Sequence, residues 1–316
     1  MSTQLTLKPL IATPPSAFDP AGSAAALSAE AIWLLGIVAA AVFVLIAALT
    51  FHALRRRRPV RERLWVLGGG LAFPLVVLAL LFGYSTVRSV ALLKPAPDDA
   101  LLVTVIAHGW WWEMRYRGPD GADVVSANEL RLPVGRPVRL ALTASDVIHS
   151  FWVPQLAGKV DMVPGRINHL ALVAQRAGIY RGQCAEFCGV AHARMALQAV
   201  VMAPQAFDDW LAAEARDAVP PATPRAQAGA ALFAQSGCAA CHTVRGASVG
   251  ATLAPDLTHV AGRGTLGAGT LANGPGAMRA WITGVQTLKP GASMPSFGHL
   301  PPETLAALAE YLEGLR

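Results

Sequence analysis

The side chains best suited to metal chemistry gather in one short segment of this 316-residue chain. Cys184, Cys188, His192 and Met195 lie within a twelve-residue segment, and His149 lies upstream. Thiolate sulfur combined with imidazole favours copper or zinc over hard cations, and a thioether favours copper because zinc sites rarely use methionine. A cysteine pair alone is more often a disulfide outside the cytoplasm, and a methionine alone is more often core filling. The joint pattern predicts a copper site.

A second cysteine pair predicts a covalently attached haem. Cys238 and Cys241 are separated by two residues and followed directly by His242, which is the attachment motif of c-type haem. The histidine becomes one axial ligand, and a methionine as the other raises the redox potential. Met294, in a loop of Gly, Pro and Ser, is favoured over Met278, which lies in a helical run. A redox dithiol or half a zinc site shares this spacing, but no further cysteine pair remains for zinc.

Two apolar runs precede both motifs. The first, from Ala31 to Leu54, has no formal charge, and the second runs from Leu64 to about Tyr84, so each is long enough to cross a bilayer. Six arginines between Arg55 and Arg63 are opposed only by Glu62. Positively charged loops stay in the cytoplasm, so both termini are expected on the opposite side. A buried helical hairpin of a soluble protein is the disfavoured alternative, because core helices rarely flank an arginine run.

Composition agrees with a membrane protein. Hydrophobic residues make up 53% of the chain and charged residues 15%, which is too apolar for an ordinary soluble protein. The net charge of +6 comes almost entirely from the arginine cluster between the two apolar runs. The rest of the chain is close to neutral, which argues against a nucleic-acid-binding surface.

The elements that must hold the metal ligands are short strands. From about Asp98, apolar stretches alternate with Gly, Pro and Asp, a pattern that predicts an antiparallel β-sandwich or barrel. A helix is expected over 204–216 and a semi-rigid, proline-rich linker over 217–227, followed by a part with helices at both of its ends. The expected strands cover residues 101–107, 124–125, 137–143, 169–174 and 196–202.

Several of these stretches together resemble a known family. The segment around Cys184 and Cys188 resembles the dinuclear copper site of cytochrome c oxidase subunit II, and residues 109–116, 146–154 and 159–166 are similar to further parts of that family. This resemblance covers roughly residues 30–215. The C-terminal part resembles a class I cytochrome c, and the fusion of the two is similar to the caa3-type haem–copper oxidases.

The resemblance implies a multidomain membrane protein in five parts. These are an N-terminal arm, expected to be flexible; a two-helix transmembrane hairpin with a cytoplasmic Arg-rich loop; a cupredoxin-like β-sandwich with dinuclear copper; a linker; and an all-α class I cytochrome c domain. The implied ranges are 1–30, 31–93, 94–216, 217–227 and 228–316, in that order.

The resemblance also implies roles for the copper ligands. Cys184 and Cys188 would each bridge both coppers, and His149 and Met195 would complete one of them. Bridging thiolates spread one electron over two metals, and a stiff β framework limits ligand movement, so electron transfer would need little reorganisation. Weak axial ligands would tune the redox potential.

The second copper would be completed by His192 and by the backbone carbonyl of Glu186. By the same resemblance, the Glu186 side chain would face subunit I and help to hold a magnesium ion there. In the haem domain, the Pro255 carbonyl would accept a hydrogen bond from His242.

Trp110 matches the family's surface tryptophan through which electrons enter. The segment departs from the family at Gly109 and Met114, where glutamine and an aromatic residue are common. A core or interfacial aromatic is the alternative role. Because side chains alternate along a strand, Trp110 and Trp112 are expected to share a face and Trp111 to point the other way.

The implied function is subunit II of a terminal cytochrome c oxidase, an oxidoreductase complex. Electrons would pass from a cytochrome-type donor through haem c to copper and on to the haem of subunit I, where oxygen is reduced to water with proton translocation. Glu62 is similar to the family's glutamate for proton uptake; an arginine-paired surface acid is the alternative. The implied partners are subunit I and subunit III, in the bacterial inner membrane, with the copper and haem domains of this multi-pass protein on the periplasmic side.

Other functions fit part of the same pattern of motifs. The chain could be a membrane-anchored periplasmic electron carrier serving another reductase. A copper-delivery or storage protein is disfavoured, because delivery needs no haem. Nitrous oxide reductase shares the copper motif but has a large propeller domain without a counterpart here, and quinol-using relatives have lost the copper ligands that this chain retains.

Overall fold

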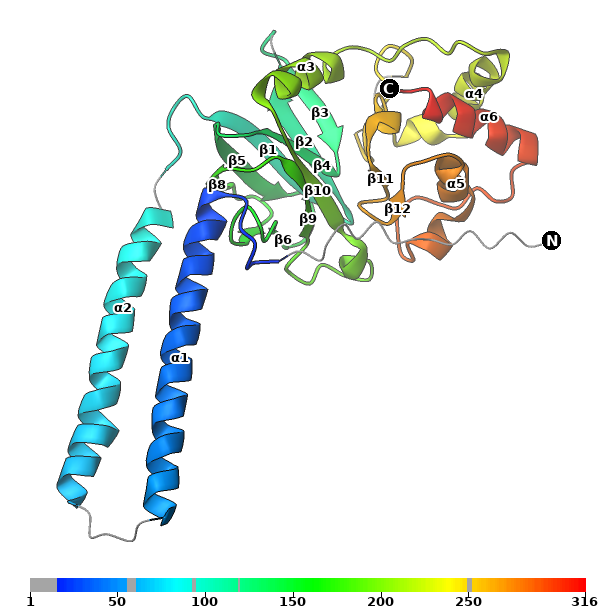
Figure 1. Ribbon diagram of the computed structural model, residues 1–316. Coiled ribbons are helices and arrows are strands. Elements are labelled where there is room, and N and C mark those ends of the chain that lie inside the picture. The colour runs from blue at the N-terminus through cyan, green and yellow to red at the C-terminus, as the bar shows by residue number, and fades with distance from the viewer. Residues whose placement is uncertain (1–15, 56–60, 93–94, 119, 249–251) are drawn as a thin grey trace.

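The computed structural model describes residues 16–55, 61–92, 95–118, 120–248 and 252–316. Two long helices extend from one side of a β-rich body, and a helical part lies against another side of that body (Figure 1). Arg56, Arg57 and Arg58 of the expected cytoplasmic loop lie outside the described residues.

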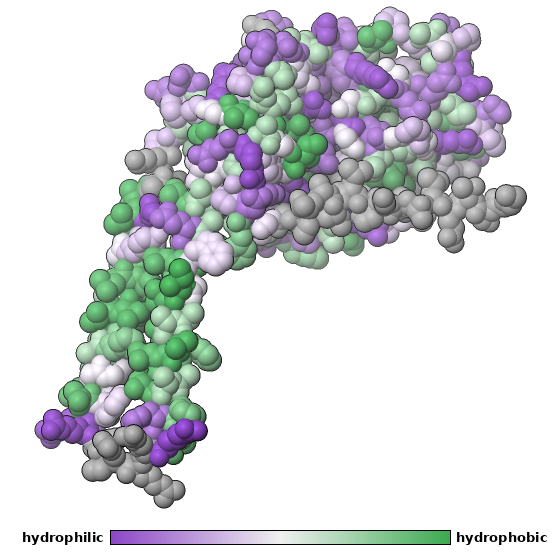
Figure 2. All heavy atoms as spheres, in the orientation of Figure 1, coloured by the Kyte–Doolittle hydropathy of each residue, from purple (hydrophilic) through white to green (hydrophobic). Residues whose placement is uncertain are grey.

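The hairpin consists of α1 (Ser23–Arg55) and of a π-helical stretch, η1 (Leu64–Ala72), that continues into α2 (Phe73–Leu92). Both helical segments are long and apolar enough to cross a membrane. Their large apolar side chains face outward, with Phe43 and Phe82 each 74% exposed. Figure 2 shows hydrophobic residues along most of the hairpin and hydrophilic residues at its far end. These outward apolar faces suit the interior of a membrane, where lipid or partner membrane helices would cover them.

The segment before the membrane helix is packed against the β-rich body. Gly22 forms a β-bridge with Ala174, and Asp19 pairs with Arg176 at 2.9 Å. A Cβ on Gly22 would lie 2.5 Å from the carbonyl oxygen of Leu156, so only glycine allows this approach. The expectation of a flexible arm through residue 30 is therefore wrong over residues 16–30. Small side chains let this segment pack closely, and α1 begins at Ser23 rather than at residue 31.

The β-rich body is a sandwich of two sheets with strand orders β3-β2-β1-β5-β8 and β4-β10-β9. Every expected strand stretch lies wholly or largely within one of these strands. The pairs β1–β5 and β4–β10 are parallel, so the sandwich is mixed rather than antiparallel as expected. Their bounds are β1 Leu101–His108, β2 Trp111–Arg117, β3 Asp123–Ala127, β4 Glu129–Pro133, β5 Pro137–Ala144, β8 Asn168–Val173, β9 Gly178–Gln183 and β10 Ala196–Met202. A separate ribbon pairs β6 (His149–Phe151) with β7 (Val160–Met162).

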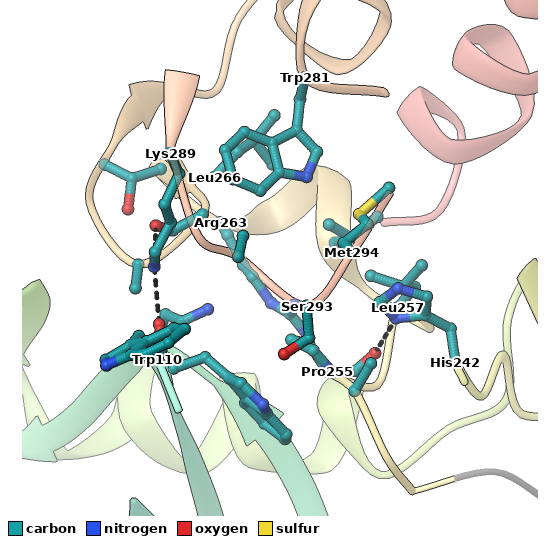
Figure 3. A pocket seen from close by; sticks show the side chains of 18 of the residues that line it. Trp110, His242, Pro255, Leu257, Arg263, Leu266, Trp281, Lys289, Ser293 and Met294 are labelled. Carbon is teal, nitrogen blue, oxygen red and sulfur yellow. Dashed lines mark hydrogen bonds between the residues drawn. The ribbon is translucent and has the colours of Figure 1, made fainter. Parts of the chain in front are cut away.

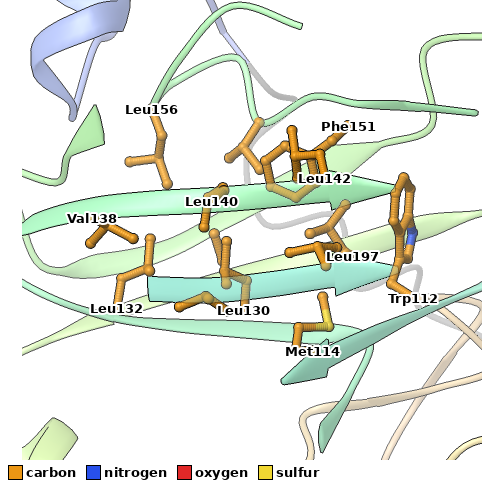
Figure 4. Packing of buried hydrophobic residues seen from close by; sticks show 14 of the residues in the cluster. Trp112, Met114, Leu130, Leu132, Val138, Leu140, Leu142, Phe151, Leu156 and Leu197 are labelled. Carbon is orange, nitrogen blue, oxygen red and sulfur yellow. The ribbon is translucent and has the colours of Figure 1, made fainter. Parts of the chain in front are cut away.

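The core of the sandwich lies between the two sheets (Figure 4). Alternate residues of β1 point inward, including Val103 and Val105, which are fully buried. Leu140, on the neighbouring strand β5, and Leu130, on β4 of the other sheet, belong to the same buried cluster. Burial of each such side chain contributes about 1.5–3 kcal/mol, so the framework behind the candidate metal ligands is stiff and well packed.

The helical part begins after α3 (Pro204–Glu214). Helix α4 (Pro224–Gln235) starts at Pro224, where the Thr223 side chain accepts the N–H of Ala226 at 3.0 Å, so the connection is shorter than the expected linker. Helices α5 (Ala277–Leu288) and α6 (Pro302–Glu313) complete this part. Between the helices of this part lie the short turns η3 (Cys238–Ala240) and η4 (Val260–Gly262) and the hairpin of β11 (Thr265–Leu266) and β12 (Leu271–Ala272). A further turn, η2 (His192–Arg194), belongs to the sandwich, in the loop between β9 and β10.

Candidate metal centre and haem cavity

The loop between β9 and β10 positions most of the candidate copper ligands. The two strands pair directly, and the N–H of Cys184 donates to the carbonyl of Met195 at 2.9 Å, so the two ends of the loop are fixed. His149 comes from β6, and the loop is attached to that strand because the N–H of Ala185 donates to the carbonyl of Ser150 at 3.0 Å. Two segments far apart in sequence thus meet at one place.

The sulfur and nitrogen atoms of this cluster lie close together. Cys184 Sγ lies 3.7 Å from Cys188 Sγ and 3.9 Å from His149 Nδ1. Cys188 Sγ lies 3.5 Å from His192 Nδ1 and 3.9 Å from Met195 Sδ. Each thiol therefore has its own imidazole, and the thioether lies beside Cys188.

The carbonyl oxygen of Glu186 is the sixth nearby donor, 3.2 Å from Cys184 Sγ. Its carboxylate is half-exposed, and one oxygen lies 3.9 Å from the ammonium of Lys159. The side chain thus points away from the sulfur atoms and is available to a partner at the surface.

Burial and hydrogen bonding fix the histidine on β6. His149 is fully buried, and its Nε2 lies 2.8 Å from Asp146 Oδ1. Burial opposes protonation of the ring, but contacts with Cys184 and Asp146 outweigh it and raise the pKa of His149. Burial likewise opposes ionisation of Asp146, but His149 and the N–H groups of Val147 and Gly109 lower its pKa below the ordinary value. The carboxylate therefore holds the ring with Nδ1 directed at the thiols.

The two thiols affect each other strongly. A hydrogen bond from Cys188 is the largest effect that lowers the pKa of Cys184, while the neighbouring Cys184 raises the pKa of Cys188. One thiolate forms readily and a second is disfavoured, because two anions this close repel each other. A bound cation would remove that repulsion. Soft sulfur donors with two imidazoles and a weak thioether suit copper, so the residues present fit this metal.

A cavity in the helical part contains the candidate haem ligands. It encloses about 970 Å³ of empty space, part of it open to solvent. His242 lines it, and its Nδ1 lies 2.7 Å from the Pro255 carbonyl, as the resemblance implied, which leaves Nε2 for a ligand bond. Met294 also lines the cavity, from a loop across from His242 (Figure 3). Turn η3 carries Cys238 directly before Cys241 and His242.

Two polar atoms support a haem in this cavity. Arg263 Nε and Thr265 Oγ1 are buried, and neither has a hydrogen-bond partner among the described residues. Both residues line the cavity. Buried donors without partners are costly, and the carboxylates of a haem would supply acceptors for them. Met278 lines the cavity as well, but it is 3% exposed within α5 and packs in the core of this part.

The three consecutive tryptophans have different surroundings. Trp112 is fully buried in the sandwich core, and Trp111 stacks on His108 with ring centroids 4.2 Å apart. Trp110 lies before β2 begins, so strand alternation does not extend to it. The expectation that Trp110 and Trp112 share a face is therefore wrong, and Trp110 and Trp111 instead line the same cavity.

Trp110 also contacts the candidate copper cluster. Its indole Nε1 donates to the carbonyl of Cys188 at 2.8 Å, and its own carbonyl accepts a hydrogen bond from Lys289 at 2.6 Å. Lys289 could not be recognised from the sequence, because a single lysine before a Pro-Gly pair gives no sign that it is buried.

Several further hydrogen bonds join the helical part to the sandwich. Arg131 Nη2 donates to the Gly262 carbonyl at 3.1 Å, and the Ala196 N–H donates to the Ala268 carbonyl at 3.1 Å. The haem cavity therefore opens onto the sandwich near Trp110 and Asn128. Glu62, by contrast, is exposed at the start of the second membrane helix, at the opposite end of the hairpin from both sites.

Comparisons with known proteins also separate the sandwich from the helical part. The family model for "Cytochrome C oxidase subunit II, periplasmic domain" matches residues 120–202, and the model for "Cytochrome c" matches residues 226–316. Cytochrome c oxidase subunit 2 of Alkalihalophilus pseudofirmus is 31% identical over 316 residues, which cover 95% of this chain and 91% of that protein. The Bacillus subtilis protein of the same name is 33% identical over 229 residues, 69% of this chain and 63% of the relative.

Among solved structures, the periplasmic domain of subunit II of a Bradyrhizobium japonicum cytochrome oxidase is similar to the central part of the chain. It is 29% identical and has a TM-score of 0.35, and the match covers 37% of this chain and 95% of that one.

Proposed function

The chain belongs to the cytochrome c oxidase subunit 2 family, and we propose that its copper and haem sites form the electron-input arm of a haem–copper oxidase. The observation that carries this proposal is the position of Trp110. Its indole is hydrogen-bonded to Cys188 of the copper cluster, and the same residue lines the cavity that contains His242 and Met294. The candidate copper site and the candidate haem site thus lie on opposite sides of Trp110.

In the copper site, Cys184 and Cys188 would hold two copper ions, with His149 and Met195 as further ligands. His192 and the Glu186 carbonyl would supply the remaining donors. The contacts of 3.2–3.9 Å among these atoms support this assignment. When bound, the copper pair supplies one-electron redox chemistry.

The protein's contribution there is rigidity. Asp146 orients His149, the paired strands β9 and β10 fix the loop ends, and burial keeps water away from the sulfur atoms. Ligands held in this way move little when their charge changes, because hydrogen bonds and burial fix the loop around them.

In the haem site, Cys238 and Cys241 would attach a haem covalently, and His242 and Met294 would hold its iron, which supplies one-electron redox chemistry when bound. The Pro255 carbonyl orients the His242 ring, which sets the ligand strength of its other nitrogen. Burial lowers the pKa of His242, so the ring is neutral and can act as a ligand near neutral pH. Arg263 and Thr265 hold the haem carboxylates.

The membrane hairpin attaches both sites to the bacterial inner membrane, with the two cofactor domains on the periplasmic side. We assign subunits I and III as partners and a cytochrome as the electron donor. The half-exposed Glu186 side chain helps to hold magnesium at the contact with subunit I. Glu62, exposed at the cytoplasmic end of the hairpin, takes part in proton uptake.

Purification in mild detergent tests this function. The full chain should co-purify with a haem-containing subunit of many membrane spans, and the preparation should reduce oxygen when supplied with a reduced cytochrome. Recovery of the chain without such a subunit, together with electron delivery to a different reductase, would identify it as a free-standing carrier instead.

A further inference from the structure

We propose that Lys289 is a positioning residue that attaches the haem-ligand loop to Trp110 and thereby sets the placement of the haem site relative to the copper site. The proposal rests on the proposed function, which makes these two sites electron-transfer partners. Lys289 directly follows α5 and begins the loop that leads to Met294.

The ammonium group of Lys289 joins two parts of the chain. Its Nζ donates to the Trp110 carbonyl at 2.6 Å and to the Gly267 carbonyl at 2.9 Å. The first carbonyl belongs to the copper domain and the second to the haem domain. The lysine lies beside Trp110 at the edge of the cavity (Figure 3).

Burial makes this arrangement unusual for a lysine. The side chain is 3% exposed, and burial lowers its pKa to about 7. Buried amines are destabilising unless they are hydrogen-bonded, and an apolar side chain would fill the space at a smaller desolvation cost. What only the amine provides is directed hydrogen bonding to both domains. Its particular contribution is therefore to geometry rather than to net stability.

Trp110 is held on its other side by the copper loop. Its indole donates to Cys188, and Gly189, at φ +111°, packs against the ring, since a Cβ there would lie 2.9 Å from Cζ2. One residue is thus fixed at its backbone by the haem-ligand loop and at its side chain by the copper loop.

The residues on either side of Lys289 also contact the copper loop. Arg194 donates a hydrogen bond to the Leu288 carbonyl. A Cβ on Gly291 would lie 2.3 Å from a methyl carbon of Val190, so the backbone at Gly291 passes close to this side chain. Segment 288–291 therefore meets the copper-ligand loop through Leu288 and Gly291, and Lys289 between them is buried against Trp110.

The test compares Lys289→Met with Arg131→Met in the purified oxidase complex. Both substitutions remove a side-chain donor of a hydrogen bond across the domain interface, but Arg131 donates to the Gly262 carbonyl and does not line the haem cavity. Hydrogen exchange of segments 109–112 and 288–294 reports the contact without depending on turnover. Flash-induced reduction reports the rate of electron transfer from haem to copper.

In Lys289→Met, exchange in segment 109–112 should become about tenfold faster, the scale expected for loss of one ordinary hydrogen bond. Haem-to-copper transfer should slow by a similar factor, with the copper and haem spectra unchanged. Arg131→Met should leave exchange of segment 109–112 as it is. Equal effects of the two substitutions, or no effect of Lys289→Met, would overturn the proposal.

A second variant, Lys289→Gln, keeps the test decisive if the oxidase complex does not assemble with Lys289→Met. Lys289→Gln retains a neutral donor, so its exchange and transfer rates should lie between those of the wild type and Lys289→Met; rates equal to wild type would contradict the proposal. Metal and haem analysis separates this result from failure of the proposed function. A wild-type complex without copper or haem would refute that function, whereas hydrogen exchange would still decide the role of Lys289.

Discussion

The indole Nε1 of Trp110 donates a hydrogen bond to the carbonyl oxygen of Cys188 across 2.8 Å. The contact links a residue of the haem cavity to a candidate copper ligand, although the two lie 78 positions apart in sequence. Neither neighbouring tryptophan has this position, since Trp111 stacks on His108 and Trp112 lies in the sandwich core. Their roles should therefore separate in experiments.

Trp110→Ala should slow haem-to-copper electron transfer while leaving both cofactors spectroscopically intact, because the ring lies between the sites but supplies no ligand. Trp110→Phe keeps an aromatic ring and loses one hydrogen bond, so its stability should fall by only about 0.5–1.5 kcal/mol. Flash-induced kinetics that follow both centres separately provide the measurement.

Trp111→Ala and Trp112→Ala are the comparison variants. Trp112→Ala should lower the free energy of unfolding of the copper domain by about 3–5 kcal/mol, because the Trp112 side chain is fully buried. Unchanged transfer in a folded Trp110→Ala protein would show that electrons cross elsewhere, and loss of copper in that variant would indicate a core role for Trp110.

Met294 and Met278 should respond differently to substitution. Met294→Ala should leave haem covalently attached, open its sixth position and lower its redox potential. Met278→Ala should leave the ligation unchanged but destabilise the domain by about 2–5 kcal/mol, because this side chain is buried in the core. Redox titration and visible spectra distinguish the two, and the reversed pair of phenotypes would show that Met278 is the ligand.

Asp146→Asn should weaken copper binding by about 10- to 100-fold, because the carboxylate orients His149. The substitution should also change the acid stability of the metal-free protein. The pKa of Asp146 is lowered in the folded state, so its contribution is present above the ordinary value of 3.8 and is lost as pH falls through the lower folded value. In Asp146→Asn, the fall in the free energy of unfolding that protonation of this carboxylate causes should be absent. Equilibrium unfolding at several pH values measures this free energy. A copper affinity equal to wild type would argue against the orienting role.

Gly229 should be essential to the pairing of α4 with α6. A Cβ at this position would lie 2.1 Å from the Ala307 carbonyl, so Gly229→Ala must push the two helices apart, at a cost of about 1–3 kcal/mol. Gly274→Ala is the matched control, because a Cβ there would meet no atom within 4 Å. Denaturant unfolding followed by haem absorbance would show the difference, and equal stability of the two variants would contradict this account.

Sequence patterns were most informative where chemistry is local. The Cys-x-x-Cys-His motif and the ligand-rich segment from Cys184 to Met195 identified side chains that the fold brings close together. Their assignment as ligands stays a prediction. The two membrane helices and most strands were also recognisable, because periodicity and uncharged runs are properties of the sequence itself.

Features that depend on distant parts of the chain were missed. The early start of α1 results from packing of Ala25 and Ala29 against residues that come much later in sequence. The parallel pairing of β1 with β5 depends on topology, which no local pattern encodes. No local pattern marked Lys289, because the hydrogen bond from its side chain to Trp110 joins residues 179 positions apart.

Cofactor analysis of the purified chain decides whether the candidate ligands hold dinuclear copper and a covalent haem. We expect two copper ions and one covalent haem per chain, with an unpaired electron shared between the two coppers in the oxidised state. Cys184 and Cys188 should remain unlinked in the metallated protein, as the 3.7 Å separation of their sulfur atoms allows. A disulfide between these two cysteines in fully metallated protein, or a single metal ion per haem, would contradict these expectations.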